Sequence, residues 1–191
     1  MTVSPDLEGE SRLELDPRLR RCCRRVPTMA PATIRTARLS DAGEIAQLTT
    51  QLGYDLTEVD APDRLSRLLL GDDQQFFVAD VDGRAVGWAH VVFAEYIDAE
   101  PFVVVGGLVV DRNHRRLGIG RALMDRAEAW ATERGCSIVR LTSSATRTVA
   151  HRFYERLGYT NIKRQYSFIK PLNSAAGARM RSFVPRVDSV S

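Results

Sequence analysis

The order of the segments between residues 102 and 135 constrains the fold of this chain more than any other feature. A continuous apolar run at residues 102–110 has the length and composition of a strand buried on both faces. The turn at residues 115–120 follows it, and apolar residues at helical spacing then continue to Gly135. A strand, a glycine-containing turn and a helix in this order form an anion site, because the first amides of the helix lack partners and the helix dipole is positive there.

The residues of this turn narrow the anion to a phosphate-bearing ligand. Gly118 and Gly120 lack the Cβ atoms that would hold a diphosphate away from the amides, and Arg115, Arg116 and Arg121 add positive charge. No Lys-Ser or Lys-Thr pair follows the second glycine, so a nucleoside-triphosphate P-loop is disfavoured. The glycine spacing also differs from that of the dinucleotide fingerprint.

Strands and helices alternate along the rest of the chain. The dipeptide Asp82-Gly83 is the strongest turn signal and predicts a hairpin. A right-handed crossover through the helix that ends at Gly135 would place the next strand parallel to residues 102–110. The expected strands are residues 33–37, 75–80, 85–93, 102–110, 137–142 and 165–170, and the expected helices begin near Ser40, Pro62, Gly118 and Val149.

A length of 191 residues with 44% hydrophobic content suits one domain with a sizeable core. We expect a folded domain at residues 32–171, a disordered N-terminal extension at residues 1–31 and a C-terminal tail at residues 172–191. The extension is rich in arginine and could contact nucleic acid. It lacks interleaved aromatic residues, however, so we interpret it as a solvated arm and expect no nucleic-acid partner.

The composition also argues against membrane and metal-binding classes. No apolar stretch approaches the roughly 20 residues of a membrane span, and the N-terminus has no apolar signal core, so we expect a cytoplasmic protein without a membrane partner. Three cysteines form no disulfide framework, and no His-Cys cluster has zinc-ligand spacing. We therefore predict no metal site.

The order Arg-x-x-Gly-x-Gly resembles the acetyl-CoA-binding signature of the GNAT superfamily of N-acetyltransferases. The segment before it, Leu108-Val109-Val110-Asp111, is similar to the fourth strand of that family, and residues 150–159 resemble its closing helix motif. The resemblance covers residues 32–171. It implies an α/β (α+β) fold with a central mixed, mostly antiparallel twisted sheet of six to seven strands, helices on both faces and a splayed strand pair that admits acetyl-CoA.

The function implied by the resemblance is transfer of an acetyl group from acetyl-CoA to a primary amine, on a small molecule, by direct attack in a ternary complex. Tyr154 would protonate the departing CoA thiolate, since its phenol is protonated at neutral pH. An amide near Val109 would polarise the acetyl carbonyl. The residues implied to bind the cofactor are Leu108, Val109, Val110, Arg115, Arg116, Leu117, Gly118, Ile119, Gly120 and Arg121.

Two departures from the family pattern leave parts of the chemistry open. Arg147 stands where many relatives carry an asparagine that contacts the pantetheine arm. Residues 103–107 contain no ionisable side chain, whereas relatives often carry a glutamate there as general base, so the base is unassigned. We expect the loop carboxylates to hold a cationic amine instead. These carboxylates are Asp55, Glu95, Asp98 and Glu100.

The three histidines and the one cysteine outside the extension receive lesser roles. We expect His90 in a strand on the substrate side, His114 in the loop near the cofactor and His151 on the helix surface. Cys136 is a poor nucleophile candidate because the start of a strand would bury it and no base is evident beside it.

Two alternative functions stay open. The acceptor could be a protein lysine or N-terminus, or the chain could be a CoA-binding regulatory module without catalysis. The missing strand carboxylate supports the regulatory module, and the retained Tyr154 opposes it. Dimers are common in the family, so the sequence also leaves a homodimer open.

Overall fold

The computed structural model describes residues 31–172, which form a five-stranded sheet in the order β1-β2-β3-β4-β5. Neighbouring strands are antiparallel except for β4 and β5, which are parallel as the crossover predicts. Only residue 31 of the predicted N-terminal extension lies within the described residues. Only residue 172 of the predicted C-terminal tail does so. The strands are β1 Thr33–Thr36, β2 Gln74–Val81, β3 Arg84–Tyr96, β4 Ala99–Val110 and β5 Val139–Leu141.

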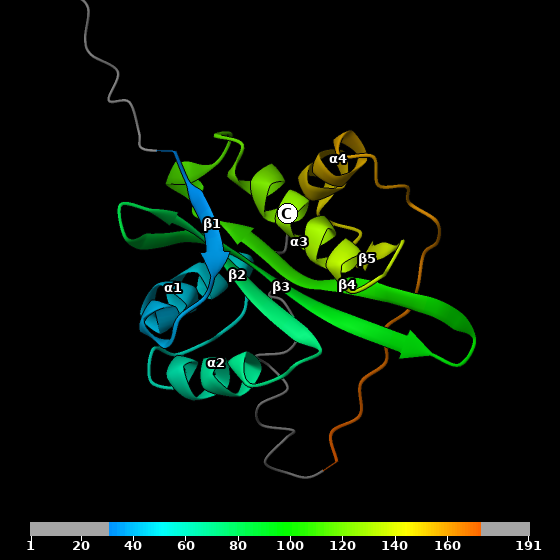
Figure 1. The fold of residues 1–191 in the computed structure, drawn as a ribbon, viewed down its shortest axis with the longest axis horizontal. Helices are drawn as coiled ribbons and strands as arrows, with labels where there is room; N and C mark the ends of the chain where they lie inside the picture. The colour runs from blue at the N-terminus through cyan, green and yellow to red at the C-terminus, as the bar shows by residue number, and fades with distance from the viewer. Residues whose placement is uncertain (1–30, 173–191) are drawn as a thin grey trace, which may run out of the picture. The chain divides into compact units, whose positions relative to one another are not determined.

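Helices cover both faces of the sheet, as expected (Figure 1). The helices α1 (Ala42–Leu52) and α2 (Ala61–Leu69) lie on one face, and α3 (Ile119–Glu133) and α4 (Thr148–Arg156) lie on the other. Two short 3-10 helices, η2 (Leu39–Asp41) and η3 (Arg112–His114), precede α1 and α3. None of the helices in this part of the chain is long and apolar enough to cross a membrane.

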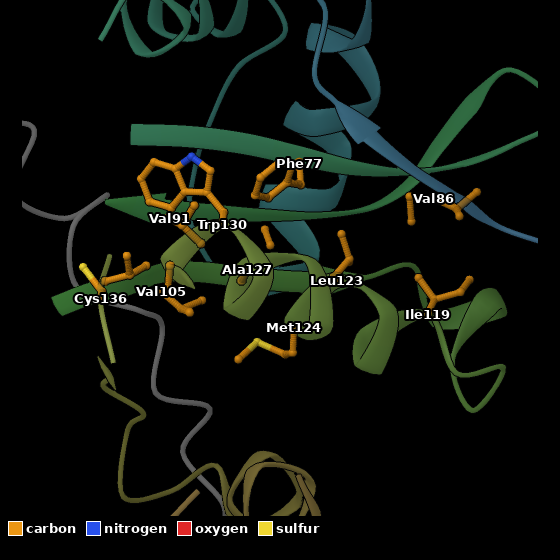
Figure 2. Close-up of a cluster of buried hydrophobic side chains, with 14 residues drawn as sticks. Phe77, Val86, Val91, Val105, Ile119, Leu123, Met124, Ala127, Trp130 and Cys136 are labelled. Atoms are coloured by element: carbon orange, nitrogen blue, oxygen red, sulfur yellow. The ribbon is translucent and has the colours of Figure 1, made fainter. Parts of the chain in front are cut away.

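Each face of the sheet has its own hydrophobic core because side chains alternate along a strand. Phe77 turns toward α3, where Leu123 and Met124 are fully buried (Figure 2). Its neighbour Phe76 turns the other way and packs with Trp88 beneath α1 and α2. The sheet therefore separates the α3 side of the domain from the α1/α2 side.

A bulge in β4 opens the sheet between β4 and β5. The register of β4 against β3 shifts between His90 and Val91, which leaves Gly106 as the extra residue. The pairing of β4 with β5 extends only over Val103–Val105 and ends at this bulge. Because a bulge bends and twists the strand that carries it, the end of β4 separates from β5. The predicted splayed strand pair is thus present, and its edge is unpaired from Gly106 onward within the described residues.

The strand count differs from the predicted six to seven. Residues 165–170 were expected to form a strand, but the structure gives them no strand pairing and leaves them exposed. In this segment Tyr166 and Phe168 alternate with polar residues, a pattern that favours a strand only where a neighbouring edge supplies hydrogen bonds. The other predicted strands and helices are confirmed within a few residues at each end.

Candidate active site

The start of α3 presents backbone amides without a side-chain cap. Its first intrahelical hydrogen bond runs from the amide of Ala122 to the carbonyl of Gly118 over 3.0 Å, and no side chain in the described structure caps the helix. The amides of the preceding turn are therefore available to an anion. Gly118 has φ of 82° and Arg116 has φ of 65°, so both lie in the left-handed region, and the non-glycine Arg116 holds a strained conformation there.

The arginines of this turn have different surroundings. Arg115 donates from Nε to the carbonyl of Val110 over 3.1 Å, which fixes the turn to the end of β4. Arg116 and Arg121 are exposed beside the helix start. Positive charge consequently surrounds the free amides, while Arg115 also has a structural contact.

The two glycines of this turn have different surroundings. A Cβ atom at Gly118 would meet nothing within 4 Å, but one at Gly120 would lie 3.2 Å from Cζ and 3.4 Å from Cε2 of Phe153. The missing side chain of Gly120 thus allows α4 to pack closely on α3. That Gly120 also lets a diphosphate approach the amides stays a prediction, and Gly118 faces open space.

Backbone groups of β4 alternate between β3 and the open edge. Asp111 donates its amide to the carbonyl of Val86 in β3 over 2.8 Å. Backbone groups facing the same neighbour recur every second residue, so those of Val109 also face β3. Those of Leu108 and Val110 face the open edge. The amide of Val109 itself thus belongs to the sheet, which leaves those of Leu108 and Val110 as the amides near Val109 that can meet a cofactor.

The turn after β4 is tied to α1 by a contact that we did not foresee. Gln51 donates from Nε2 to Asp111 over 2.8 Å and accepts the amide of Arg112 over 3.1 Å. The Gln51 hydrogen bond is the largest reason why the pKa of Asp111 falls to about 2, and contacts from Asn113 and His114 add to it. The sequence signal was only an aspartate directly after a strand, a common turn initiator.

Tyr154 lies half-buried on α4 within an aromatic group. Its ring centroid is 5.1 Å from that of Phe153 and 6.0 Å from that of Tyr159. The hydroxyl of Tyr159 donates to Glu128 over 2.8 Å, whereas that of Tyr154 has no hydrogen bond within residues 31–172. Burial raises the pKa of Tyr154, and the positive charge of Arg147 partly opposes this shift. The phenol is therefore protonated at neutral pH and available as a donor.

Arg147 and His151 bond to backbone carbonyls. Arg147 donates to the carbonyl of Leu52 at the end of α1, so it links α4 to α1. The Nε2 atom of His151 lies 2.9 Å from the carbonyl of Ser144, and no hydrogen bond joins His151 to Tyr154. The interpretation of His151 as a helix-surface residue agrees with this contact.

A pocket lies on the α1/α2 face of the sheet and extends to the bulge of β4. Its lining is mainly apolar, with His90 and Thr49 as polar groups and Arg64 as the charged one. None of the described residues that line it carries a carboxylate. The lining residues are Ile45, Thr49, Leu56, Ala61, Arg64, Leu65, Leu68, Phe76, Trp88, His90, Gly106 and Gly107.

The carboxylates expected to hold an amine do not line this pocket. Glu95, Asp98 and Glu100 are exposed near the turn between β3 and β4, at the end of the long hairpin in Figure 1. At about 3.3 Å per residue, Glu95 lies roughly 16 Å along β3 from His90. The expectation that these carboxylates and Asp55 hold a cationic amine stays a prediction.

Two further predictions concern nucleophiles and metals. Cys136 is buried at 8% exposure in the core beside α3 (Figure 2), as predicted, and is therefore remote from bulk solvent. Across residues 31–172, no three His, Cys, Asp or Glu side chains gather as metal ligands. The absence of a metal site stays a prediction.

Comparisons with known proteins give consistent matches. Residues 43–159 match the acetyltransferase (GNAT) family. An uncharacterised N-acetyltransferase of Chlorobaculum tepidum is 32% identical over 137 residues, which span 72% of this chain and 81% of that protein. The aminoglycoside N(6')-acetyltransferase type 1 of Stenotrophomonas maltophilia is 30% identical over 149 residues, which span 75% of this chain and 96% of that protein.

Solved structures agree in fold. The aminoglycoside N-acetyltransferase AAC(6')-Iy in complex with CoA matches with a TM-score of 0.67 and 24% identity, over 76% of this chain and 98% of that chain. The aminoglycoside 6'-N-acetyltransferase AAC(6')-IG of Acinetobacter haemolyticus matches with a TM-score of 0.65 and 20% identity, over 74% and 99%. These likenesses show a shared fold.

Proposed function

Since the chain belongs to the acetyltransferase (GNAT) family and is an acetyl-CoA-dependent enzyme, we propose that it acetylates the primary amine of a small molecule by direct attack in a ternary complex. The observation that carries this proposal is the pocket on the α1/α2 face, which reaches the β4 bulge from the side opposite to α3 and α4. An amine and a thioester can then approach the same point from opposite faces of the sheet.

In this proposal, the amides at the start of α3 hold the diphosphate of acetyl-CoA. The absence of a side-chain cap on α3, the open space beside Gly118 and the exposed Arg116 and Arg121 support this placement. The CoA bound in the AAC(6')-Iy structure named above also supports it, because the two folds correspond.

The open edge of β4 supplies the groups for the thioester arm. Leu108 and Val110 present unpaired backbone groups there, although Arg115 already shares the carbonyl of Val110. An amide aimed at the acetyl carbonyl stabilises the negative charge that develops on its oxygen during attack. We assign this role to the amide of Leu108, which lies next to the glycine bulge.

Tyr154 completes the proposed machinery as the acid. Phe153, its neighbour, packs against Gly120 at the start of α3, so the phenol lies close to the helix end that would hold CoA. Its raised pKa and its hydroxyl without a protein partner suit donation to a departing thiolate.

The pocket favours an amine that is carried on an apolar body. Phe76, Trp88 and Leu65 provide apolar surface, and Arg64 repels a polycation. Aminoglycosides, the substrates named for the Stenotrophomonas relative, carry several positive charges and would need carboxylates that the described lining lacks. A cytoplasmic location and a homodimer stay predictions.

The test is thiol release from acetyl-CoA with three classes of acceptor. We expect 2-phenylethylamine and related monoamines to release thiol with a higher kcat/KM than kanamycin or lysine-containing peptides. A preference for the peptides would favour the protein-acetyltransferase alternative. CoA binding in calorimetry without thiol release from any acceptor would favour the non-catalytic module.

A further inference from the structure

We propose that His90 accepts the proton that the attacking amine loses, through the Nδ1 atom of its imidazole. This inference rests on the proposed acetyl transfer and assigns the base that the sequence of β4 does not supply. His90 belongs to β3, the strand next to β4, and its side chain lines the pocket on the α1/α2 face.

The bulge of β4 brings His90 to the place where the thioester would lie. A Cβ atom built on Gly106 would be 3.3 Å from Nδ1 of His90, and one on Gly107 would be 2.7 Å from Cζ3 of Trp88. Both positions of the bulge therefore turn toward the α1/α2 face, where a side chain at Gly107 would clash with the Trp88 ring and one at Gly106 would crowd the imidazole. Nδ1 consequently lies over the point where β4 leaves β5.

Gln74 determines which nitrogen of His90 is free. The Nε2 atom lies 3.0 Å from Oε1 of Gln74, and an amide oxygen can only accept a hydrogen bond. Nε2 therefore carries the hydrogen of the neutral ring, and Nδ1 keeps its lone pair. Phe76 stacks on the imidazole at 5.6 Å between ring centroids, which limits its rotation.

The surroundings keep the imidazole neutral and therefore basic. Burial lowers the pKa of His90 from its ordinary value of 6.5. Of the elements around it, α2 contributes the charged Arg64 to the pocket, whereas β2 contributes Gln74 and Phe76 and β4 contributes glycines. Arg64 also disfavours a second positive charge in the pocket, and no described carboxylate lines it.

Two side chains, His90 and Tyr154, take up and supply the protons of the acetyl transfer. The amine nitrogen forms a bond to the acetyl carbon and gives one proton to Nδ1 of His90. The carbon–sulfur bond breaks, its electron pair stays on sulfur, and the thiolate takes a proton from Tyr154. His90 then releases its proton to water, and Tyr154 regains one from water. An amine that enters as the ammonium loses its first proton to solvent before attack.

The test compares wild type with His90→Asn, which removes the basic nitrogen, and Gln74→Glu, which changes only the partner of Nε2. The control is His151→Asn, since His151 bonds to the Ser144 carbonyl away from the pocket. The acceptor is the best monoamine of the panel above, and each variant is measured for kcat at saturating amine between pH 5 and pH 9 and for CoA affinity by calorimetry.

We expect His90→Asn to lower kcat by about 10² to 10⁴ and to remove the acidic limb of its pH profile, with CoA affinity unchanged. We expect Gln74→Glu to move that limb to higher pH, by about one unit or more, because a carboxylate on Nε2 stabilises the imidazolium. If His90 had only a packing role, the acidic limb would stay at the same pH in both His90→Asn and Gln74→Glu. We expect His151→Asn to match wild type.

Other outcomes would overturn the assignment. An acidic limb that stays unchanged in both His90→Asn and Gln74→Glu, with amine acetylation intact, would overturn His90 as the base and leave the proposed function in place. If His90→Asn does not fold, Gln74→Glu and an NMR titration of His90 in wild type test the assignment instead. The pKa of His90 from NMR must then equal the pKa of the acidic limb in the kinetics. A wild-type protein that acetylates no amine would overturn both proposals together.

Discussion

Tyr154 and Tyr159 place the same chemical group in the same aromatic cluster, with ring centroids 6.0 Å apart. Within the described residues, Tyr159 donates its hydroxyl to Glu128, and Tyr154 has no such partner. The Tyr154 hydroxyl is thus left to solvent or to a ligand, whereas that of Tyr159 is held by the protein. The two residues thus form a natural pair of variant and control.

We expect Tyr154→Phe to lower kcat by about 10² to 10⁴ while the Kd of acetyl-CoA changes little, because an acid acts on the thiolate and only in the transition state. Tyr159→Phe removes the same oxygen, and we expect it to reduce stability without lowering kcat. Single-turnover kinetics, in which chemistry limits the rate, provide the measurement. Equal kcat values for Tyr154→Phe and wild type would return Tyr154 to a packing role.

At the scale of elements, the sequence predicted what depends on neighbouring residues and missed what depends on register. The turn before α3 was recognisable because the strand, the turn with Gly118 and the helix follow one another directly in the chain. The contact between His90 and Gln74 was not, because it joins two strands and needs the pairing of Phe76 with His90 to be known. The partner of Gly120 likewise lies 33 positions later, at Phe153, and no periodicity reveals it.

The two glycines of the α3 turn should respond differently to alanine. A methyl group at Gly120 would press on the Phe153 ring, so we expect Gly120→Ala to displace α4 and Tyr154, with a larger loss in kcat than in CoA affinity. A methyl group at Gly118 would meet open space, but the alanine would have to adopt a left-handed backbone conformation, which costs about 1–2 kcal/mol. We therefore expect the turn to relax in free Gly118→Ala and CoA binding to weaken about tenfold, because binding must restore the left-handed turn.

Calorimetry with CoA and single-turnover kinetics separate these effects of the two alanine variants. A Gly120→Ala variant that loses CoA affinity but keeps its chemical rate would reverse the assignment. Gly120 would then approach the diphosphate, as the sequence alone indicated.

At the scale of the whole molecule, one ionic cluster joins the first strand to both the sheet and the first helix. Arg35 in β1 forms two hydrogen bonds to Asp41, of 2.8 and 2.9 Å, and a third to Asp80 in β2 of 2.8 Å. Asp41 also accepts the amide of Arg38 over 2.7 Å and is the one charged residue fully buried in the described chain, at 5% exposure. Breaking a buried pair of this kind leaves an uncompensated charge.

Burial alone would raise the pKa of Asp41, but the hydrogen bonds from Arg35 and Arg38 and the charge of Arg35 outweigh it, so the pKa is lowered. The stabilisation is then complete above the unfolded pKa of about 3.9 and is lost as pH falls below it. We expect Asp41→Asn to lower the free energy of unfolding by about 3–5 kcal/mol at pH 7 and by less at pH 3. Urea unfolding at both pH values provides the measurement.

The matched control is Asp63→Asn, which removes an exposed pair with Arg67 whose carboxylate side chain is 72% exposed. An exposed pair contributes little, so we expect a change within about 0.5 kcal/mol at either pH. The difference between Asp41→Asn and wild type should shrink at pH 3, because Asp41 is then partly protonated in the unfolded chain and its charge no longer favours folding fully. A difference that stays constant from pH 7 to pH 3 would mean that Asp41 stabilises the fold through its shape and neutral hydrogen bonds, and the ionic account of how β1 is held would be wrong.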